Sequence, residues 1–208
     1  MVINWYGLSC FKIQSGTATA VFNPFSKLSG LTPPKGEGSI LLVSLDEPSF
    51  NNISTLKAQP FVVDGPGEYE HQGIRIRGIA TYGPEAKKIN TAYLFETEDM
   101  RLLHLGALSQ ERLSDEQIEQ IGNIDILIIP TGGGDFINAE QAIEIINQIE
   151  PSIVIPSHFK TKGVKEKLDG AEVFLKQIGQ KDVEPKDKLT VKKKDIPIDR
   201  MEVVVLKV

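Results

Sequence analysis

Three histidines and one cysteine are the side chains of this sequence best suited to metal binding or nucleophilic chemistry. The histidines are His71, His104 and His158, and the cysteine is Cys10. Zinc in proteins is held by nitrogen, sulfur and oxygen donors from histidine, cysteine and carboxylate side chains. A single cysteine excludes both a disulfide within the chain and a cluster of thiolates around zinc. Any metal site must therefore rest on the histidines and on carboxylates.

Cys10 and His104 each allow a catalytic and a structural interpretation. Cys10 could act as a nucleophile with His158 as its base, because the two side chains need only be adjacent in the fold. Its position between Ser9 and Phe11, in an expected strand, favours a buried structural thiol. For His104, in the sequence His-Leu-Gly, the simpler expectation is a half-buried histidine whose hydrogen bonds are satisfied.

Acidic, glycine-rich and lysine-rich stretches give weaker signals. Asp46 and Glu47 could supply oxygen ligands to a hard cation, although two acids in a loop are more often solvated. Glycines 132–134 precede an expected helix start at Asn138 and could present N–H groups to an anion, but a tight turn explains them equally well. The lysines of 186–195 are interleaved with acids and lack aromatic neighbours, which favours a solvated strand face over a phosphate-binding surface.

Short strands are expected to fill the first half of the chain. β-branched and aromatic residues gather in stretches bounded by Gly, Pro, Asn or Asp, and Gln-Ser-Gly at 14–16 indicates a hairpin. The expected strands cover residues 3–13, 17–25, 40–43, 60–63, 73–82, 91–97 and 101–106.

Helical patterns begin in the second half. Ser114 with Gln117, and Asn138 with Gln141, each form the pattern of a capping box that opens a helix. Apolar runs on either side of the second helix predict a β-α-β unit. The remaining expected elements are strands at 125–130, 152–156 and 201–208, and a third helix within 164–178 that ends at Gly179.

Length and composition are those of one globular domain. The chain has 208 residues, of which 40% are hydrophobic and 25% charged, and its formal net charge is −5. We expect a single domain covering residues 1–208. The acidic excess gives no electrostatic reason to expect nucleic acid as the main partner. The chain has neither a leader-like start nor a run of about 18 apolar residues, so a cytoplasmic location without membrane association is expected.

Several stretches resemble, in order, those of the metallo-β-lactamase superfamily, in particular the ascorbate-6-phosphate lactonase-like branch described as zinc-dependent hydrolases of the β-lactamase fold. They are WYGLSCFKI, NPF, VSLDEPSFNN, GPGEYEHQGIRIRGIATYG, HLGALS, DILIIPTGGG and IEPSIVIPSHFKT. The combination of GPGEYE, HLG and IPSHFKT is more specific than any one stretch. The resemblance covers nearly the whole chain and implies an α/β fold, the four-layer αβ/βα sandwich of the metallo-β-lactamase type.

The resemblance places the family's metal ligands on residues that mostly cannot bind metal. The family's loop Ser-His-x-His-x-Asp-His-Asn-Asn falls on residues 44–52, and of the family's seven ligand positions only His158 is retained. The six changed positions are Leu45, Glu47, Ser49, Phe50, Gly83 and Ala107. Neither an aliphatic side chain nor a phenyl ring can donate an electron pair to zinc.

These departures predict a protein that keeps the fold and the cleft, has lost both metals and acts as a binding or regulatory protein. No catalytic residue and no cofactor are expected, although the resemblance implies zinc in relatives. The alternative is a residual or repurposed hydrolase of a small phosphorylated or lactone-like metabolite, with Asp46, Glu47, Asp135 and His158 as the candidate pocket. The partner stays open between a small metabolite and a protein.

Overall fold

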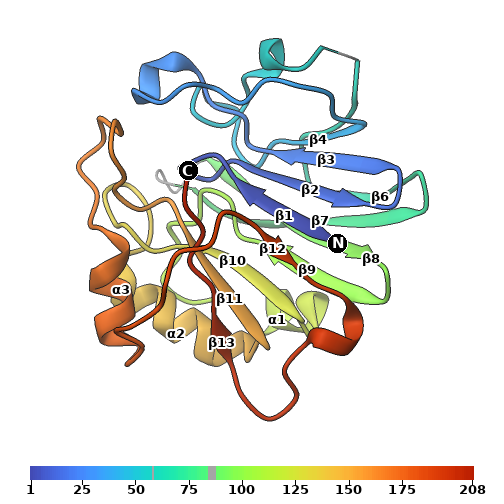
Figure 1. Ribbon diagram of the computed structural model, residues 1–208. Helices are drawn as coiled ribbons and strands as arrows, with labels where there is room; N and C mark the ends of the chain where they lie inside the picture. Colours follow the sequence, from blue (N-terminus) through green and yellow to red (C-terminus); the bar gives the residue numbers. More distant parts are fainter. Residues whose placement is uncertain (58, 84–87) are drawn as a thin grey trace.

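Six strands form the first sheet of the computed structural model, which describes residues 1–57, 59–83 and 88–208. Their order across the sheet is β12-β1-β2-β3-β4-β5 (Figure 1). The bounds are β1 (Val2–Trp5), β2 (Phe11–Ser15), β3 (Ala18–Phe22), β4 (Ile40–Leu42), β5 (Phe61–Val63) and β12 (Leu189–Thr190). β1, β2 and β3 pair antiparallel, whereas β4 joins β3 and β5 in parallel.

Residues 3–13, predicted as one extended stretch, form two strands joined by a tight turn. Hydrogen bonds from Tyr6 N to Cys10 O (2.9 Å) and from Cys10 N to Gly7 O (3.0 Å) close the turn. Leu8 takes a left-handed backbone conformation there, with φ of 49°. β1 and β2 therefore pair with each other, and Cys10 lies in the turn and not in a strand, which corrects the expectation from the sequence.

Seven strands form the second sheet, in the order β13-β11-β10-β9-β8-β7-β6. Their bounds are β6 (Gly67–His71), β7 (Ile74–Tyr82), β8 (Ile89–Thr97), β9 (Met100–His104), β10 (Ile126–Pro130), β11 (Ile153–Ser157) and β13 (Glu202–Val203). β6 to β9 form an antiparallel meander, and β9, β10, β11 and β13 run parallel. β6 is absent from the predicted strands, and the strand predicted over 201–208 shortens to β13 with an isolated bridge from Leu206 to Lys186.

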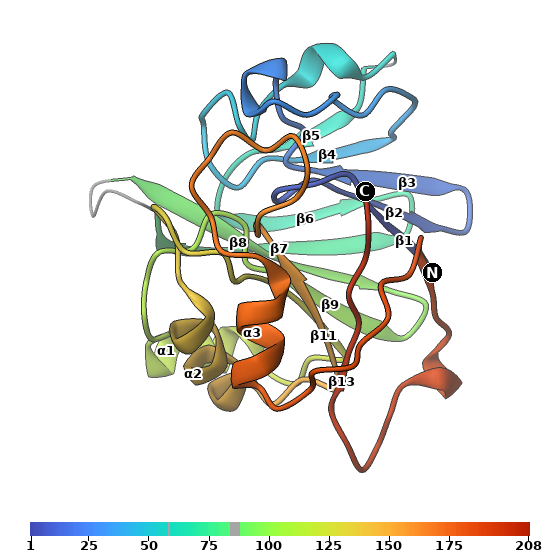
Figure 2. The same cartoon turned by 60° about the vertical axis from the view of Figure 1, so that its left-hand side comes forward.

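Three α-helices lie together on the outer face of the second sheet (Figure 2). They are α1 (Asp115–Ile121), α2 (Ala139–Ile149) and α3 (Ala171–Gln177). Both predicted capping boxes are confirmed. The side chains of Ser114 and Asn138 each accept a hydrogen bond from the backbone N–H three residues on, and their own backbone N–H groups donate to the side chains of Gln117 and Gln141. α3 ends at the predicted place, with Gly179 in the left-handed region just after it.

The outer face of the first sheet is covered by loops. Two 3-10 helices, η1 (Lys27–Ser29) and η2 (Ile53–Thr55), lie in these loops at the top of the molecule (Figures 1 and 2). Leu56, next to η2, packs on the outward-facing Val21, Leu41 and Val43. The architecture is the predicted αβ/βα sandwich, with one outer layer made of loops and 3-10 turns. A further 3-10 helix, η3 (Lys193–Asp195), precedes β13.

The main hydrophobic core lies between the two sheets and extends under the helices. Phe22 of the first sheet packs edge-on against Phe95 of the second, with ring centroids 5.7 Å apart. The Tyr93 hydroxyl donates to Val43 O (2.7 Å) and is 3.0 Å from Val63 O, so one side chain ties β8 to the ends of β4 and β5. None of the helices in the described part of the chain is long and apolar enough to cross a membrane.

Candidate functional site

His158 follows β11 directly and lies where the two sheets meet the loops. Its side chain is 1% exposed, and its backbone takes a left-handed conformation with φ of 48°. Nδ1 is 3.0 Å from Ser9 Oγ, and Nε2 is 3.0 Å from Glu166 Oε2. A carboxylate can only accept a hydrogen bond, so Nε2 carries the proton in this pair. Both ring nitrogens of His158 therefore have protein partners.

Aromatic side chains pack against this imidazole and help to bury it. The ring of Phe50 stacks parallel to it at a centroid distance of 6.1 Å, and the ring of Phe136 meets it edge-on at 4.3 Å. Leu45, Phe50 and Ala107 are buried together as a small cluster of their own, with Phe136 packed against them. We call these four residues the cleft cluster. It contains three of the six positions, other than His158, that the resemblance assigns to metal ligands, all in apolar contact beside that histidine.

Gly83 borders the same cluster. A Cβ atom added to Gly83 would lie 3.5 Å from Leu45 Cδ1 and 3.3 Å from Lys88 O. Five of the seven positions that the resemblance assigns to metal ligands thus come together, namely Leu45, Phe50, Gly83, Ala107 and His158. Glu47 instead pairs with Lys88, and no contact within the described ranges places Ser49 among them.

Local hydrogen bonds hold the 45–52 loop. Phe50 N and Asn51 N both donate to Glu47 O, at 2.8 and 3.0 Å, which makes a tight turn and directs the Phe50 ring inward. At the start of the loop, Ser44 N donates to the side chain of Asn23 (2.8 Å). At its end, the Asn52 amide donates to Phe25 O (2.9 Å).

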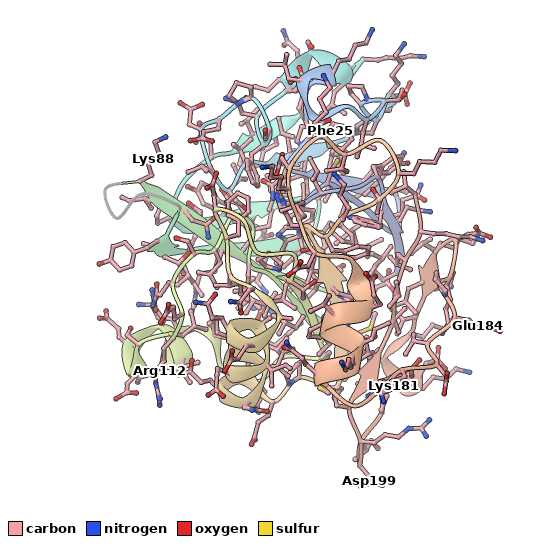
Figure 3. The ribbon with its side chains drawn as sticks, turned by 90° about the vertical axis from the view of Figure 1, so that its left-hand side faces the viewer. Phe25, Lys88, Arg112, Lys181, Glu184 and Asp199 are labelled. Atoms are coloured by element: carbon pink, nitrogen blue, oxygen red, sulfur yellow. The ribbon has the colours of Figure 1, made fainter. Side chains whose placement is uncertain are left out.

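The four residues of the candidate acid–base pocket make separate contacts. Asp46 accepts from the Asn51 amide at 2.6 Å, and Glu47 pairs with Lys88 at 2.6 Å near the end of the β7–β8 hairpin (Figure 3). Asp135 is exposed in the loop between β10 and α2. His158 pairs with Glu166. None of the hydrogen bonds or ion pairs among the described residues links two members of this set.

His104 is fully buried, not half-buried as the sequence suggested. Gly106 N donates to its Nδ1 (3.0 Å), so Nε2 carries the proton and donates to Ser9 O (3.2 Å). Burial lowers the pKa of His104 to about 3. The ring is neutral and satisfied, as predicted, and it packs between Phe11 and Phe22.

Cys10 is a buried thiol. It has no exposed surface, and burial raises the pKa of its thiol well above the ordinary value. A thiol held in this protonated form is a poor nucleophile. It packs with Leu8, Phe25 and Val164, in agreement with the structural interpretation.

Glu166 is the residue of the site that the sequence did not reveal. It lies in the loop between β11 and α3, flanked by Lys165 and Lys167 in what reads as an ordinary charged surface segment. The hydrogen bond from His158 is the main cause that lowers the pKa of the Glu166 carboxyl. Ser9, the other partner of His158, lies in a stretch that the sequence placed in a strand.

The glycines at 132–134 form the tight connection between β10 and α2. A Cβ atom on Gly132 would lie 2.3 Å from His158 O, so only glycine permits this approach of the two backbones. Gly133 N donates to Ile137 O at 3.2 Å, which closes the turn before the Asn138 cap. Of the two interpretations of these glycines, the tight turn therefore accounts for the segment without a bound anion.

The side chains around His158 do not fit a zinc ion. The cleft cluster offers only hydrocarbon, the imidazole is bonded on both nitrogens, and Glu47 is paired with Lys88. Zinc requires three or four donors at about 2.0 to 2.3 Å. Across the described ranges, no group of three or more His, Cys, Asp or Glu side chains is arranged to hold a metal ion.

Two sheets packed face to face, with α-helices over the outer face of the second, are typical of the metallo-β-lactamase fold class. The family model described as the β-lactamase superfamily domain matches residues 2–158, and the chain belongs to this family.

Among curated relatives, a UPF0173 protein of Pyrococcus furiosus is 32% identical over 94 residues, 45% of this chain and 42% of the relative. A UPF0173 metal-dependent hydrolase of Enterococcus faecalis is 30% identical over 121 residues, 57% of this chain and 50% of the relative. The aligned part of the chain thus spans about half the length of these relatives.

A solved structure from Thermotoga maritima, named for the Zn-dependent hydrolases of the metallo-β-lactamase superfamily, is similar over 98% of this chain and 97% of that chain. Its TM-score is 0.82 and its sequence identity is 29%. The relatives from Enterococcus faecalis and Thermotoga maritima are thus named as metal-dependent or Zn-dependent hydrolases.

Proposed function

We propose that this protein is a metallo-β-lactamase-fold protein without metal-assisted hydrolysis, and that it acts by binding a small metabolite or a protein partner. The observation that carries the proposal is the cleft cluster. Leu45, Phe50 and Ala107 stand at positions that resemble ligand positions, and all three are buried against each other beside His158.

The electrostatics of the cleft support the same proposal. In a two-metal hydrolase, cations offset the charge of crowded carboxylates and polarise the attacking water. Here Glu166 faces Nε2 of His158, so a carboxylate takes the contact that a ligand histidine would give to a metal. Apolar burial of Phe50 and Leu45 contributes about 1.5 to 3 kcal/mol each to folding, whereas metal ligands are stable in a cleft only when the ion is bound.

Zinc stoichiometry tests the proposal. The protein is purified in zinc-supplemented buffer, dialysed, and analysed for metal by mass spectrometry beside His158→Ala. We expect far less than one zinc per chain and no difference between the two proteins. Near-stoichiometric zinc in the wild-type protein that His158→Ala removes would overturn the proposal.

A second candidate is a metal-independent hydrolase of a small phosphorylated or lactone-like metabolite. Relatives named as hydrolases favour hydrolysis as the activity, although those relatives are metal-dependent. The metal-independent route is favoured by Ser9, His158 and Glu166, which form a hydroxyl–imidazole–carboxylate chain with two contacts of 3.0 Å. In such a chain the imidazole takes the hydroxyl proton while the carboxylate orients it. Ser9 is 1% exposed, so this chemistry requires the Phe50 and Phe136 rings to move.

Hydrolysis assays separate the two candidates. A panel of simple lactones and phenyl phosphate esters is incubated with the protein, with Ser9→Ala and with His158→Ala. Binding without turnover supports the first candidate. Turnover that survives chelator and disappears in both variants would establish the second.

A further inference from the structure

A cavity of about 600 Å³ lies between the two loops that cover the outer face of the first sheet. One wall comes from residues 27–35, around η1, and the other from residues 52–57, around η2. The lining residues are Lys27, Thr32, Pro33, Lys35, Asn52, Ser54, Leu56 and Lys57. None of these residues belongs to the cleft cluster, so the cavity is a separate site, which we call the loop pocket.

The charge of the loop pocket is opposite to that of the chain. Lys27, Lys35 and Lys57 line it and no acid does, whereas the whole chain carries −5. Within the described ranges, no salt bridge or side-chain hydrogen bond engages any of these three lysines. Three positive charges on the walls of one cavity, with no acid among the lining residues, favour an anion as the occupant.

A fourth lysine stands behind the same loop. Lys35 also borders a smaller cavity lined by Lys12 and Gly36, and Lys12 Nζ is 4.0 Å from the position of a Cβ atom on Gly36. Glu37 is the acid in the lining of that smaller cavity. The smaller cavity therefore adds one lysine and one acid behind the 34–37 turn, and the excess of positive charge stays with the loop pocket.

The loop pocket is larger than a single ion requires, and part of its wall is apolar. The pocket volume is that of a small-molecule site. Leu56, half-buried on Val21, Leu41 and Val43, supplies an apolar surface, and Pro33 is buried beside it. The Leu56 position is set by the parallel bridge to Gly36 and by the bond from Lys57 N to Gly36 O (3.1 Å). The two walls are thus tied together at their base.

We propose that the loop pocket binds a small molecule that carries a phosphate group on a body with an apolar face. Lysines recognise phosphate as point charges, and three of them match a dianion better than the single charge of a carboxylate. Nucleic acid is the less suitable occupant, because the pocket lining contains no aromatic side chain on which a base could stack. The proposal does not depend on whether the cleft binds a metal.

Amide chemical shifts of the full chain, titrated with phenyl phosphate at constant ionic strength, test the proposal. We expect saturable shifts confined to residues 27–36 and 52–57, with smaller shifts from inorganic phosphate and none from phenol. The triple variant Lys27→Glu, Lys35→Glu and Lys57→Glu should weaken binding by about tenfold or more, since each exposed ion pair contributes a factor of about 1.5 to 5.

The matched control is Lys181→Glu, Lys188→Glu and Lys194→Glu, which changes the net charge equally. Figure 3 labels Lys181 at the far end of the molecule from the loop pocket. Equal weakening by both triple variants would overturn the proposal, because it would reduce the effect to overall charge. So would shifts centred on His158, or a single-stranded oligonucleotide that displaces phenyl phosphate from the same residues.

Discussion

Phe50 is the residue on which the proposal of a site without metal rests most directly. Its ring is 1% exposed, stacks on His158 and contacts Phe136. Its burial converts a position that resembles a ligand into part of the hydrophobic interior. The stability of the cleft therefore depends on this ring.

Phe50→Ala is expected to lower the free energy of unfolding by about 3 to 5 kcal/mol, because it leaves a cavity beside His158. Phe61→Ala is the matched control. Phe61 is 38% exposed and stacks on His71, so its loss should lower the free energy of unfolding by less than about 2 kcal/mol. Urea unfolding measures both. Equal losses would contradict the role given to the cleft cluster.

His104 makes stability depend on pH. Its folded-state pKa of about 3 lies below the ordinary 6.5, so below 6.5 the unfolded chain binds a proton that the folded protein does not. The contribution of His104 to the free energy of unfolding is fully present above pH 6.5. It falls by about 1 kcal/mol per pH unit as the pH is lowered from 6.5 towards 3. Unfolding free energies in His104→Gln should fall less steeply over this window. The same pH dependence of the unfolding free energy in His104→Gln and in the wild-type protein would contradict the low pKa given to His104.

At the scale of elements, the segment between β11 and α3 is held by a mixture of side-chain and backbone contacts. Glu166 bonds to His158, Lys160 Nζ donates to Val164 O (2.6 Å), and Asp169 N donates to Gly132 O (2.9 Å). This segment has no helix or strand of its own before α3. Its order therefore depends on these contacts and on backbone bonds such as the one from Lys165 N to Ser29 O (3.0 Å).

Glu166→Ala is expected to speed amide hydrogen exchange across residues 160–169 without unfolding α3, because it removes the contact to His158. Lys167→Ala is the control, since Lys167 is exposed in the same segment. Exchange is followed by mass spectrometry of peptides. Unchanged exchange in Glu166→Ala, or equal acceleration in Lys167→Ala, would show that the ion pair does not hold the segment.

At the scale of the whole molecule, the described residues contain no group of side chains suited to hold a metal ion, and we therefore predict that metal does not support folding. A ligand that binds only the folded state raises the melting temperature, and its removal lowers it. We expect EDTA to leave the melting temperature unchanged. A clear decrease with EDTA, reversed by added zinc, would show that a metal contributes to the fold.

Rebuilding the first half of a metal site is not expected to restore it. The four-fold variant is Leu45→His, Glu47→His, Ser49→Asp and Phe50→His. It should bind zinc weakly and lose stability, because Gly83 and Ala107 still supply no ligand and Glu166 still occupies His158. Adding Gly83→His, Ala107→Asp and Glu166→Ala should raise the zinc content towards two per chain. Two tightly bound zinc ions in the four-fold variant would refute the assigned positions.

The sequence by itself determined the elements whose signals are local. The capping boxes at Ser114 and Asn138 and the apolar runs of β10 and β11 depend on neighbours a few residues away, so their positions could be predicted. The positions of the cleft residues came from a resemblance, and the matching family and the converging residues agree with that fold.

Tertiary structure decided the features that depend on contacts between residues far apart in the sequence. The turn at residues 6–10 exists because β1 and β2 pair, and the half-exposed strand β6 exists because β7 lies beside it. The partners of His158 are 149 and 8 residues away in the chain. Glu166 has the same local sequence character as any surface acid among lysines, and only the folded loop brings it to the imidazole. The loop pocket likewise arises because two distant loops meet over one sheet face, a closeness that no local pattern encodes.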